Sequence, residues 1–303
     1  MATSRRDFLT RSAFLSLSAA ALSPALLRAA QGVPAATVTP VFTSLRRNVG
    51  FFTGRGGTIG YLVTREAAVV VDTQFPDSAP LCLAGLNERS GGRPIDLLLN
   101  SHHHGDHVGG NVVFGKTTKR AVAHATAAAH MRQPPGRPAP TGEQFYPTET
   151  FTDRWTATVG DEVLRARHYG PAHSGGDAVI TFERANVVHM GDLMFNKRHP
   201  VVDRPAGASL TNWATVLRNT ITDHDNDTVY IFGHAGGTHP VTGGHALLTE
   251  FSNYLSSLVA YAAELRKSGR SREEVTAIAT SLPGFTEHSP LTPAILGAAF
   301  DER

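Results

Sequence analysis

The sequence predicts an α/β fold, and two observations carry that prediction. The β-branched run Ala67–Asp72 is followed by a helical segment, Ser78–Glu88, and then by a second apolar run, Ile95–Leu99. This order is a β-α-β unit, in which a helix connects two parallel strands of one sheet. In the second half, strand patterns lead to a helix at Leu210–Thr222 and a buried strand at Thr228–Phe232.

The other elements follow from the same periodicities. Alternating apolar and polar residues predict strands, and apolar residues at three- to four-residue spacing predict helices. In the first half these rules predict strands at Val41–Leu45, Ile59–Val63 and Arg120–Ala123 and helices at Gly110–Phe114 and Ala125–Met131. In the second half they predict strands at Phe151–Val159, Glu162–His168, Ala178–Phe182 and Val187–Met190 and helices at Gly244–Lys267 and Ser271–Thr280.

The segment Gln133–Thr150 is rich in proline and glycine and is predicted to be a long surface loop. Loops of this length often form lids or binding loops. A segment that merely covers the sheet is an equally good interpretation of its composition.

Residues 1–30 are predicted to be a signal peptide rather than part of the fold. Ser4-Arg5-Arg6-Asp7-Phe8-Leu9 resembles the twin-arginine export signal, and Ala13–Leu27 is mildly apolar but too short for a stable membrane span. The expected organisation is therefore a signal at 1–30 and one domain at 31–303. The expected partner is the twin-arginine export machinery, and the expected location is the periplasm or the cell exterior, without stable membrane insertion after signal removal.

The charge of the mature chain gives no support for nucleic-acid binding. Removing residues 1–30 takes away four arginines and one aspartate and leaves 24 basic and 25 acidic residues. The single cysteine, Cys82, is flanked by leucines, cannot form an internal disulfide and is expected to be buried and inert. A single-domain enzyme with a small-molecule substrate is the simplest class.

The most informative motif is Ser101-His102-His103-His104-Gly105-Asp106-His107, directly after the apolar run ending at Asn100. Alternate residues of an extended segment point the same way, so His102 and His104 can bind one ion. Asp106 and His107 follow the bend at Gly105 and are free to face a second ion. Histidine and carboxylate are typical ligands of a divalent metal with an open position for water.

Three later motifs each place a histidine or aspartate beside glycine at the end of an apolar run. They are Gly170-Pro171-Ala172-His173-Ser174-Gly175-Gly176-Asp177, His189-Met190-Gly191-Asp192-Leu193-Met194-Phe195 and Ile231-Phe232-Gly233-His234-Ala235-Gly236-Gly237. In this order after H-x-H-x-D-H, over Val41 to Gly244, the chain resembles the metallo-β-lactamase superfamily.

The resemblance implies a four-layer αβ/βα sandwich of two mixed sheets with helices outside. It also implies the metal ligands: His102, His104 and His173 for the first ion, Asp106, His107 and His234 for the second, and Asp192 between them. An aspartate at position 192, where common zinc β-lactamases carry cysteine nearby, is more like glyoxalase II and related lactonases. Phe195 stands where acyl-homoserine lactonases carry tyrosine, which counts against that substrate.

The predicted function is a metal-dependent hydrolase, with dinuclear zinc favoured and iron or manganese as alternatives. Two ions about 3.5–4 Å apart can share a hydroxide that attacks an ester, thioester, lactone or lactam carbonyl. Asp106 would orient the water and shuttle its proton. No G-x-S-x-G elbow of a serine hydrolase surrounds a candidate serine.

Three alternatives stay open. One is a mononuclear iron oxidoreductase resembling the persulfide dioxygenases of this fold. The second is a non-catalytic periplasmic metal-binding accessory protein, and the third is β-lactamase activity as a subsidiary reaction.

Residues near the motifs carry further expectations. Asp72 is expected to hydrogen-bond the metal loop, the name used here for Ser101–His107. His103 is expected to be exposed, and His189 to be a core histidine whose hydrogen bonds are satisfied. Lys197 is either a cation that holds a substrate carboxylate or a solvated loop charge, and Trp213 is expected to pack in the core.

Overall fold

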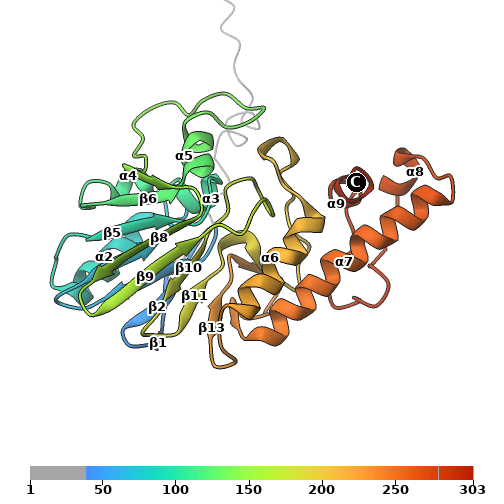
Figure 1. Cartoon of the computed structure of the whole chain (residues 1–303). Coiled ribbons are helices and arrows are strands. Elements are labelled where there is room, and N and C mark those ends of the chain that lie inside the picture. Colours follow the sequence, from blue (N-terminus) through green and yellow to red (C-terminus); the bar gives the residue numbers. More distant parts are fainter. Residues whose placement is uncertain (1–38, 279, 303) are drawn as a thin grey trace, which may run out of the picture. The chain divides into compact units, whose positions relative to one another are not determined.

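The computed structural model describes residues 39–278 and 280–302, and the predicted signal at 1–30 lies outside these residues. In the described part, two mixed sheets pack face to face with helices on their outer sides (Figure 1). This arrangement confirms the predicted αβ/βα sandwich. None of the described helices is both long enough and apolar enough to span a lipid bilayer.

The first sheet has the strand order β1-β2-β3-β4-β5-β6-β7. Its first four strands pair antiparallel, and β4 to β7 pair parallel through helical connections. The strands are β1 (Val41–Arg46), β2 (Val49–Thr53), β3 (Ile59–Val63), β4 (Ala68–Val71), β5 (Leu97–Asn100), β6 (Ala121–His124) and β7 (Glu149–Phe151).

The second sheet has the order β15-β13-β11-β10-β9-β8, and β12 pairs with β14 in a separate two-stranded sheet. In the six-stranded sheet β11 and β13 pair parallel, and all the other neighbouring strands pair antiparallel. The strands are β8 (Arg154–Val159), β9 (Glu162–Arg167), β10 (Val179–Phe182), β11 (Val187–His189), β12 (Phe195–Asn196), β13 (Val229–Ile231), β14 (His234–Ala235) and β15 (Thr242–Gly243).

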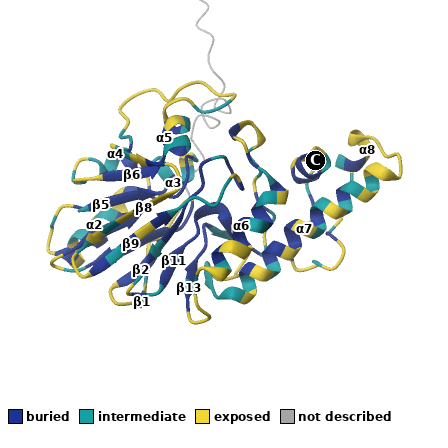
Figure 2. Cartoon of the chain, in the orientation of Figure 1, coloured by how far each residue is buried: buried dark blue, intermediate teal, exposed yellow. Residues whose placement is uncertain are grey.

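Helices cover the outer face of each sheet, and most strand residues are buried (Figure 2). Buried apolar side chains form separate clusters between the sheets and under the helices. In the first half the helices are α2 (Ala79–Ser90), α3 (Gly105–Val108), α4 (Asn111–Phe114) and α5 (Ala125–Arg132). In the second half they are α6 (Leu210–Thr222), α7 (His245–Lys267), α8 (Arg272–Thr276) and α9 (Pro293–Phe300), with short 3₁₀ turns η1 (Gly191–Leu193) and η2 (Arg204–Ala206). Cys82 on α2 is fully buried, and burial raises the pKa of its thiol, which fits the expected inert role.

The sequence patterns did not predict β2, α3 and α9, which are present in the structure. β1 and β2 form a hairpin whose turn residues, Arg47 and Asn48, both have positive φ. Such turns usually carry Asn-Gly, so Arg-Asn gave a weak signal. The predicted strand Phe151–Val159 is split between β7 in the first sheet and β8 in the second.

Strand ends from both sheets meet at one edge of the sandwich. β4 ends before Asp72, β5 before the metal loop, β11 before the turn that carries Asp192, and β13 before His234. The residues that the sequence predicts as metal ligands therefore lie at this edge.

Candidate metal centre

The metal loop changes direction at His104. β5 ends at Asn100, and His104 has extended backbone angles before the one-turn helix α3 starts at Gly105. His102 and His104 therefore precede the helix, whereas Asp106 and His107 belong to its single turn. The bend predicted at Gly105 is the start of this helix.

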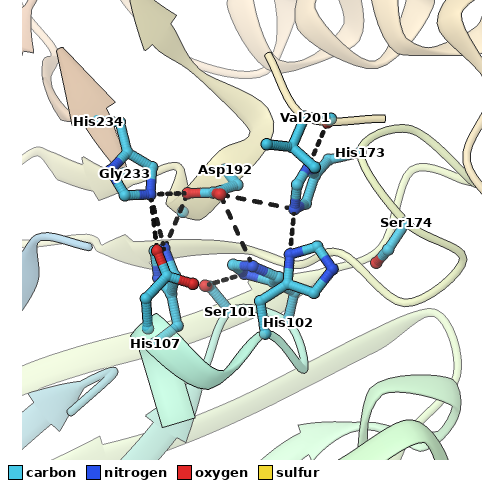
Figure 3. Close-up of polar contacts among 12 residues, drawn as sticks. Ser101, His102, His107, His173, Ser174, Asp192, Val201, Gly233 and His234 are labelled. Carbon is cyan, nitrogen blue, oxygen red and sulfur yellow. Dashed lines mark hydrogen bonds and ion pairs between the residues drawn. The ribbon is translucent and has the colours of Figure 1, made fainter. Parts of the chain in front are cut away.

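The first cluster contains the four residues His102, His104, His173 and Asp192, whose ligand atoms all lie within 4.8 Å of one another. His104 Nδ1 lies 2.8 Å from His173 Nε2, and Asp192 Oδ2 lies 3.5 Å from His173 Nε2 and 3.9 Å from His102 Nε2 (Figure 3). Histidines separated by about seventy residues thus face one point.

The second cluster contains Asp106, His107 and His234 within the same 4.8 Å limit. His234 Nε2 lies 3.1 Å from Asp106 Oδ2 and 3.3 Å from His107 Nε2. All seven predicted ligand side chains therefore converge, while their role as ligands stays a prediction.

Asp192 lies between the two clusters, on the 3₁₀ turn η1. Its Oδ2 faces His102 and His173, and its Oδ1 lies 2.9 Å from His107 Nε2 and 3.3 Å from His234 Nε2. One carboxylate thus presents one oxygen to each group of histidines, which is the arrangement expected of a bridging ligand.

Outer hydrogen bonds orient four of the histidine rings. His102 Nδ1 lies 3.0 Å from Ser101 Oγ, and His173 Nδ1 donates to the backbone carbonyl of Val201 at 2.8 Å. His107 Nδ1 donates to Asp72 and His104 Nε2 to Asp203, both at 2.8 Å. Such partners fix the ring orientation and leave the opposite nitrogen facing the clusters.

Asp72 has the role that the sequence suggested. It accepts hydrogen bonds from the backbone N–H and the hydroxyl of Ser101, at 2.8 and 2.6 Å, as well as from His107. Asp72, directly after β4, thereby fixes both ends of the metal loop by hydrogen bonds.

His103 is buried, with 8% of its surface exposed, so the expectation of exposure was wrong. Its Nε2 lies 3.4 Å from Asp203 Oδ2, and its ring packs on His130. Asp203 comes from a loop a hundred residues away in the sequence, and no motif around it indicates a contact with the metal loop.

Lys197 does not provide a free cation for a substrate. Its ammonium pairs with Glu250 and lies 2.7 Å from Glu287 Oε2. These two carboxylates raise the pKa of Lys197 despite the opposing effect of burial. The side chain joins the β12 loop to α7 instead.

Two aromatic residues pack against histidines of the two clusters. The Phe195 ring stacks on His234 with centroids 5.3 Å apart, and Trp213 approaches His173 edge-on at 5.5 Å. Trp213 is fully buried and donates from Nε1 to the carbonyl of Leu193 at 3.0 Å, which confirms its predicted packing role. His189 is buried too, hydrogen-bonded to the carbonyl of Thr58 and the N–H of Gly191, as expected.

Glycine is required where backbone meets the clusters. A Cβ on Gly57 would come within 2.1 Å of the His107 ring, and a Cβ on Gly233 within 2.1 Å of Asp192 Oδ1. Both contacts are far below any real Cβ separation, so these positions exclude larger residues.

Burial and charge divide the histidines into two groups. Burial, with the neighbouring histidines, lowers the pKa of His102 well below its usual value and that of His173 to about 3. For His107 and His234 burial acts in the same direction, but nearby carboxylates outweigh it. They raise the pKa of His107 well above its usual value and that of His234 to about 9. The carboxylates of Asp106 and Asp192 thus favour a positive charge at the second cluster, which a bound cation would supply.

The residues fit divalent metal ions. His102 Nε2 is buried and forms no hydrogen bond within the described part of the chain. An unsatisfied buried polar atom costs free energy, and a cation held by this nitrogen would remove that cost. Neutral imidazole nitrogens and carboxylates are also the donor set that zinc, manganese and iron accept.

Comparison with known proteins gives a family and a fold. Residues 52–234 match the family described as the Metallo-beta-lactamase superfamily. The sequence matches none of the curated proteins with which it was compared.

Two kinds of solved structure resemble this one. A metallo-beta-lactamase from Pontibacter korlensis has 18% identity and a TM-score of 0.59, over 72% of this chain and 99% of its own. The stereoselective inverting sec-alkylsulfatase Pisa1 from Pseudomonas sp. has 16% identity and a TM-score of 0.66, over 86% of this chain but only 50% of its own. At these identities the likeness is one of fold.

Proposed function

Because this chain belongs to the metallo-beta-lactamase superfamily, we propose that it is a metal-dependent hydrolase with two divalent ions, zinc being the favoured metal. The observation that carries the proposal is the position of Asp192, which presents one oxygen to each cluster of histidines. The proposed substrates are esters, thioesters, lactones or lactams.

When bound, the ions supply an activated water and a Lewis acid for the substrate carbonyl. The chain's own residues orient these parts. The contacts of Asp106 with His107 and His234 all involve Oδ2, and about a quarter of its side chain is exposed. We infer that the other oxygen, Oδ1, accepts the proton of the attacking water and passes it to the leaving group.

The two-cluster geometry favours this proposal over the mononuclear alternative. A single iron needs only two histidines and one carboxylate, yet Asp106, His107 and His234 form a second group of donors. One iron per chain, with oxygen uptake on glutathione persulfide, would reverse this conclusion.

Elemental analysis and a substrate panel test the proposal. The mature protein should bind two divalent ions and cleave at least one activated ester, thioester, lactone or cephalosporin. An alkyl sulfate belongs in the panel because of the structural likeness to the alkylsulfatase. Two bound ions with no activity on any substrate would favour the accessory protein.

The substitution His102→Ala removes a ligand of the first cluster. It should lower kcat/KM by at least about a thousandfold, because losing the metal removes several kcal/mol of transition-state stabilisation. His245→Ala is the matched control, since this histidine contacts Tyr230 and Asn226 rather than the clusters. Equal activity of the two variants would contradict the proposal.

We also propose that residues 1–30 direct export by the twin-arginine route. Replacing Arg5 and Arg6 together by lysine should then retain the protein in the cytoplasm, as cell fractionation would measure. Unchanged export would exclude this route.

A further inference from the structure

A cavity of about 310 Å³ borders the metal loop. Gly105 and Val108 of α3 line one side, and the other side is formed by the proline loop, defined here as residues 133–148. The sequence left open whether this loop has a role in binding or merely covers the sheet.

The walls of the cavity are largely apolar. They comprise the side chains of Val108, Met131, Pro134, Pro135, Phe145 and Tyr146. Small-molecule sites are typically concave and lined by apolar and aromatic side chains of this kind, and 310 Å³ lies at the small end of their usual volume.

Two aromatic residues fix the proline loop against the domain. The Phe145 ring fills the space over Gly115, where a Cβ would come within 2.3 Å of the ring. Tyr146 packs against the apolar cluster that includes Met131, and the guanidinium of Arg132 lies 4.7 Å from the centroid of its ring. The cavity is therefore built into the fold rather than left by a loose loop.

Six of the residues that line the cavity are polar: His103, His104, Asn111, Arg137, Gln144 and Asp203. The Asp203 carboxylate already interacts with His104 and His103. Arg137, at the exposed rim, has no acidic partner within the described part of the chain. An apolar group can thus occupy the interior without displacing an ion pair.

The cavity and the metal clusters share His104, which lines the cavity and belongs to the first cluster. Gly105 lies between His104 and Asp106, and a Cβ built on it would have no heavy atom within 4 Å. A ligand in the cavity can therefore extend across Gly105 towards Asp106, about a quarter of whose side chain is exposed.

We propose that this cavity binds the alkyl or aryl group of an ester or thioester whose carbonyl lies at the metal clusters. This inference rests on the proposed hydrolase function. It assigns the substrate class: an acyl compound with an apolar chain, rather than a small polar ester.

The experiment compares p-nitrophenyl esters from acetate to octanoate. For the wild-type protein, KM should fall by about fourfold for each added methylene until the cavity is full, as expected from burial of apolar groups. Tyr146→Ala removes one wall and should raise KM for octanoate about tenfold while kcat changes less than about twofold. For acetate, which is too short to reach this wall, KM should stay within about twofold.

Tyr261→Ala is the matched control, because Tyr261 lies on α7 and packs against the helical layer. It should leave the chain-length dependence unchanged. Melting temperature and metal content of both variants identify any general loss of structure.

Binding of 2-octanone, a ketone without a hydrolysable bond, separates this inference from the proposed function. Calorimetric titration of the metal-loaded protein should show about tenfold weaker binding for Tyr146→Ala and no change for Tyr261→Ala. If esters are cleaved without chain-length preference, or if both variants bind the ketone equally, the cavity is not the acyl site and the hydrolase proposal stands. If no ester is cleaved, the assignment of an acyl ester or thioester as substrate fails, and the wider substrate panel decides the hydrolase proposal. The ketone titration then decides by itself whether the cavity binds apolar chains.

Discussion

Asp203, which is far from the metal loop in the sequence, interacts with two of its histidines, His103 and His104. Its carboxylate contacts His104 Nε2 on the side of the ring that faces away from His173. The hydrogen bonds from His103 and His104 lower the pKa of this carboxyl far below its usual value, so it stays charged. A charged acceptor fixes the ring orientation of His104 and increases the basicity of Nδ1.

Asp203→Asn should therefore weaken metal binding about 10- to 100-fold, the usual effect of losing such a partner. Competition with a chromophoric chelator measures the affinity directly, without any assay of activity. Asp225→Asn is the control, because Asp225 accepts hydrogen bonds at the surface from Asn186 and Thr228. If both variants bind metal equally well, Asp203 has no part in holding His104.

Gly233 matters for a steric reason. Gly233→Ala would place a methyl group against Asp192 Oδ1 and against the carbonyl of Gly191, at 2.1 and 2.6 Å. The variant should lose bound metal, because Asp192 can no longer face both clusters. Elemental analysis measures the loss, and Gly244→Ala is the control, since a Cβ there meets nothing within 4 Å. Full metal content in Gly233→Ala would show that the turn can shift without cost.

At the level of elements, a pair of stacked histidines joins the two sheets. His124 ends β6 in the first sheet and His168 follows β9 in the second, with ring centroids 4.1 Å apart. Burial, and then the neighbouring His168, lowers the pKa of His124 to about 4. The ring is therefore neutral in the folded protein, while its Nε2 contacts the carbonyl of Thr152.

This pair should make the fold sensitive to acid. In the unfolded chain His124 takes up a proton near pH 6.5, whereas in the folded protein it does so only near pH 4. Stability from this group is thus complete above about pH 6.5 and is lost as the pH falls towards 4. Urea unfolding at pH 7 and pH 4.5 should show a smaller loss of stability for His124→Gln than for the wild type. Parallel losses would mean that His124 does not titrate in this range.

The sequence predicted most elements because their periodicities are local. The bounds of β3 and α6 agree with the structure, since β3 is a continuous apolar run and α6 has Ser209 as its N-cap. α9 was missed although Thr292 caps it and Pro293 is its first residue. Gly297 in its middle weakens the helical pattern.

At the level of the whole molecule, each cluster contains residues from both halves of the chain. His102, His104, Asp106 and His107 follow β5 of the first sheet, whereas Asp192 and His234 follow β11 and β13 of the second. Bound ions would therefore connect the two sheets at the edge where their strands end.

Removing the metal with a chelator should lower the melting temperature. At a metal concentration of one hundred times Kd, each bound ion adds about 2.7 kcal/mol, which corresponds to roughly 5–10 °C per ion for a domain of this size. Differential scanning calorimetry with and without chelator measures the shift. His102→Ala, which alters only the first cluster, should melt between the loaded and the chelated wild type, and a wild-type protein insensitive to chelator would contradict the metal's structural role.

The convergence of the seven side chains was predicted from motif order, because each motif lies at the end of a strand. The contacts of His103 and Asp203 were not predictable in this way. They depend on where a loop of the second half passes the metal loop. The alternation of side chains along a strand predicts no contacts for residues beyond the end of that strand, such as His103 and Asp203. The cavity beside the proline loop escaped prediction for the same reason, since its walls come from three separate segments.

The edge-on contact of Trp213 with His173 gives the protein an intrinsic optical reporter. The chain has two tryptophans, and the other, Trp155, donates to Glu149 where β8 meets β7. In a Trp155→Phe background all indole emission would come from the position that touches a predicted ligand. Loading and loss of the ions could then be followed in real time, without a dye and before any substrate is known.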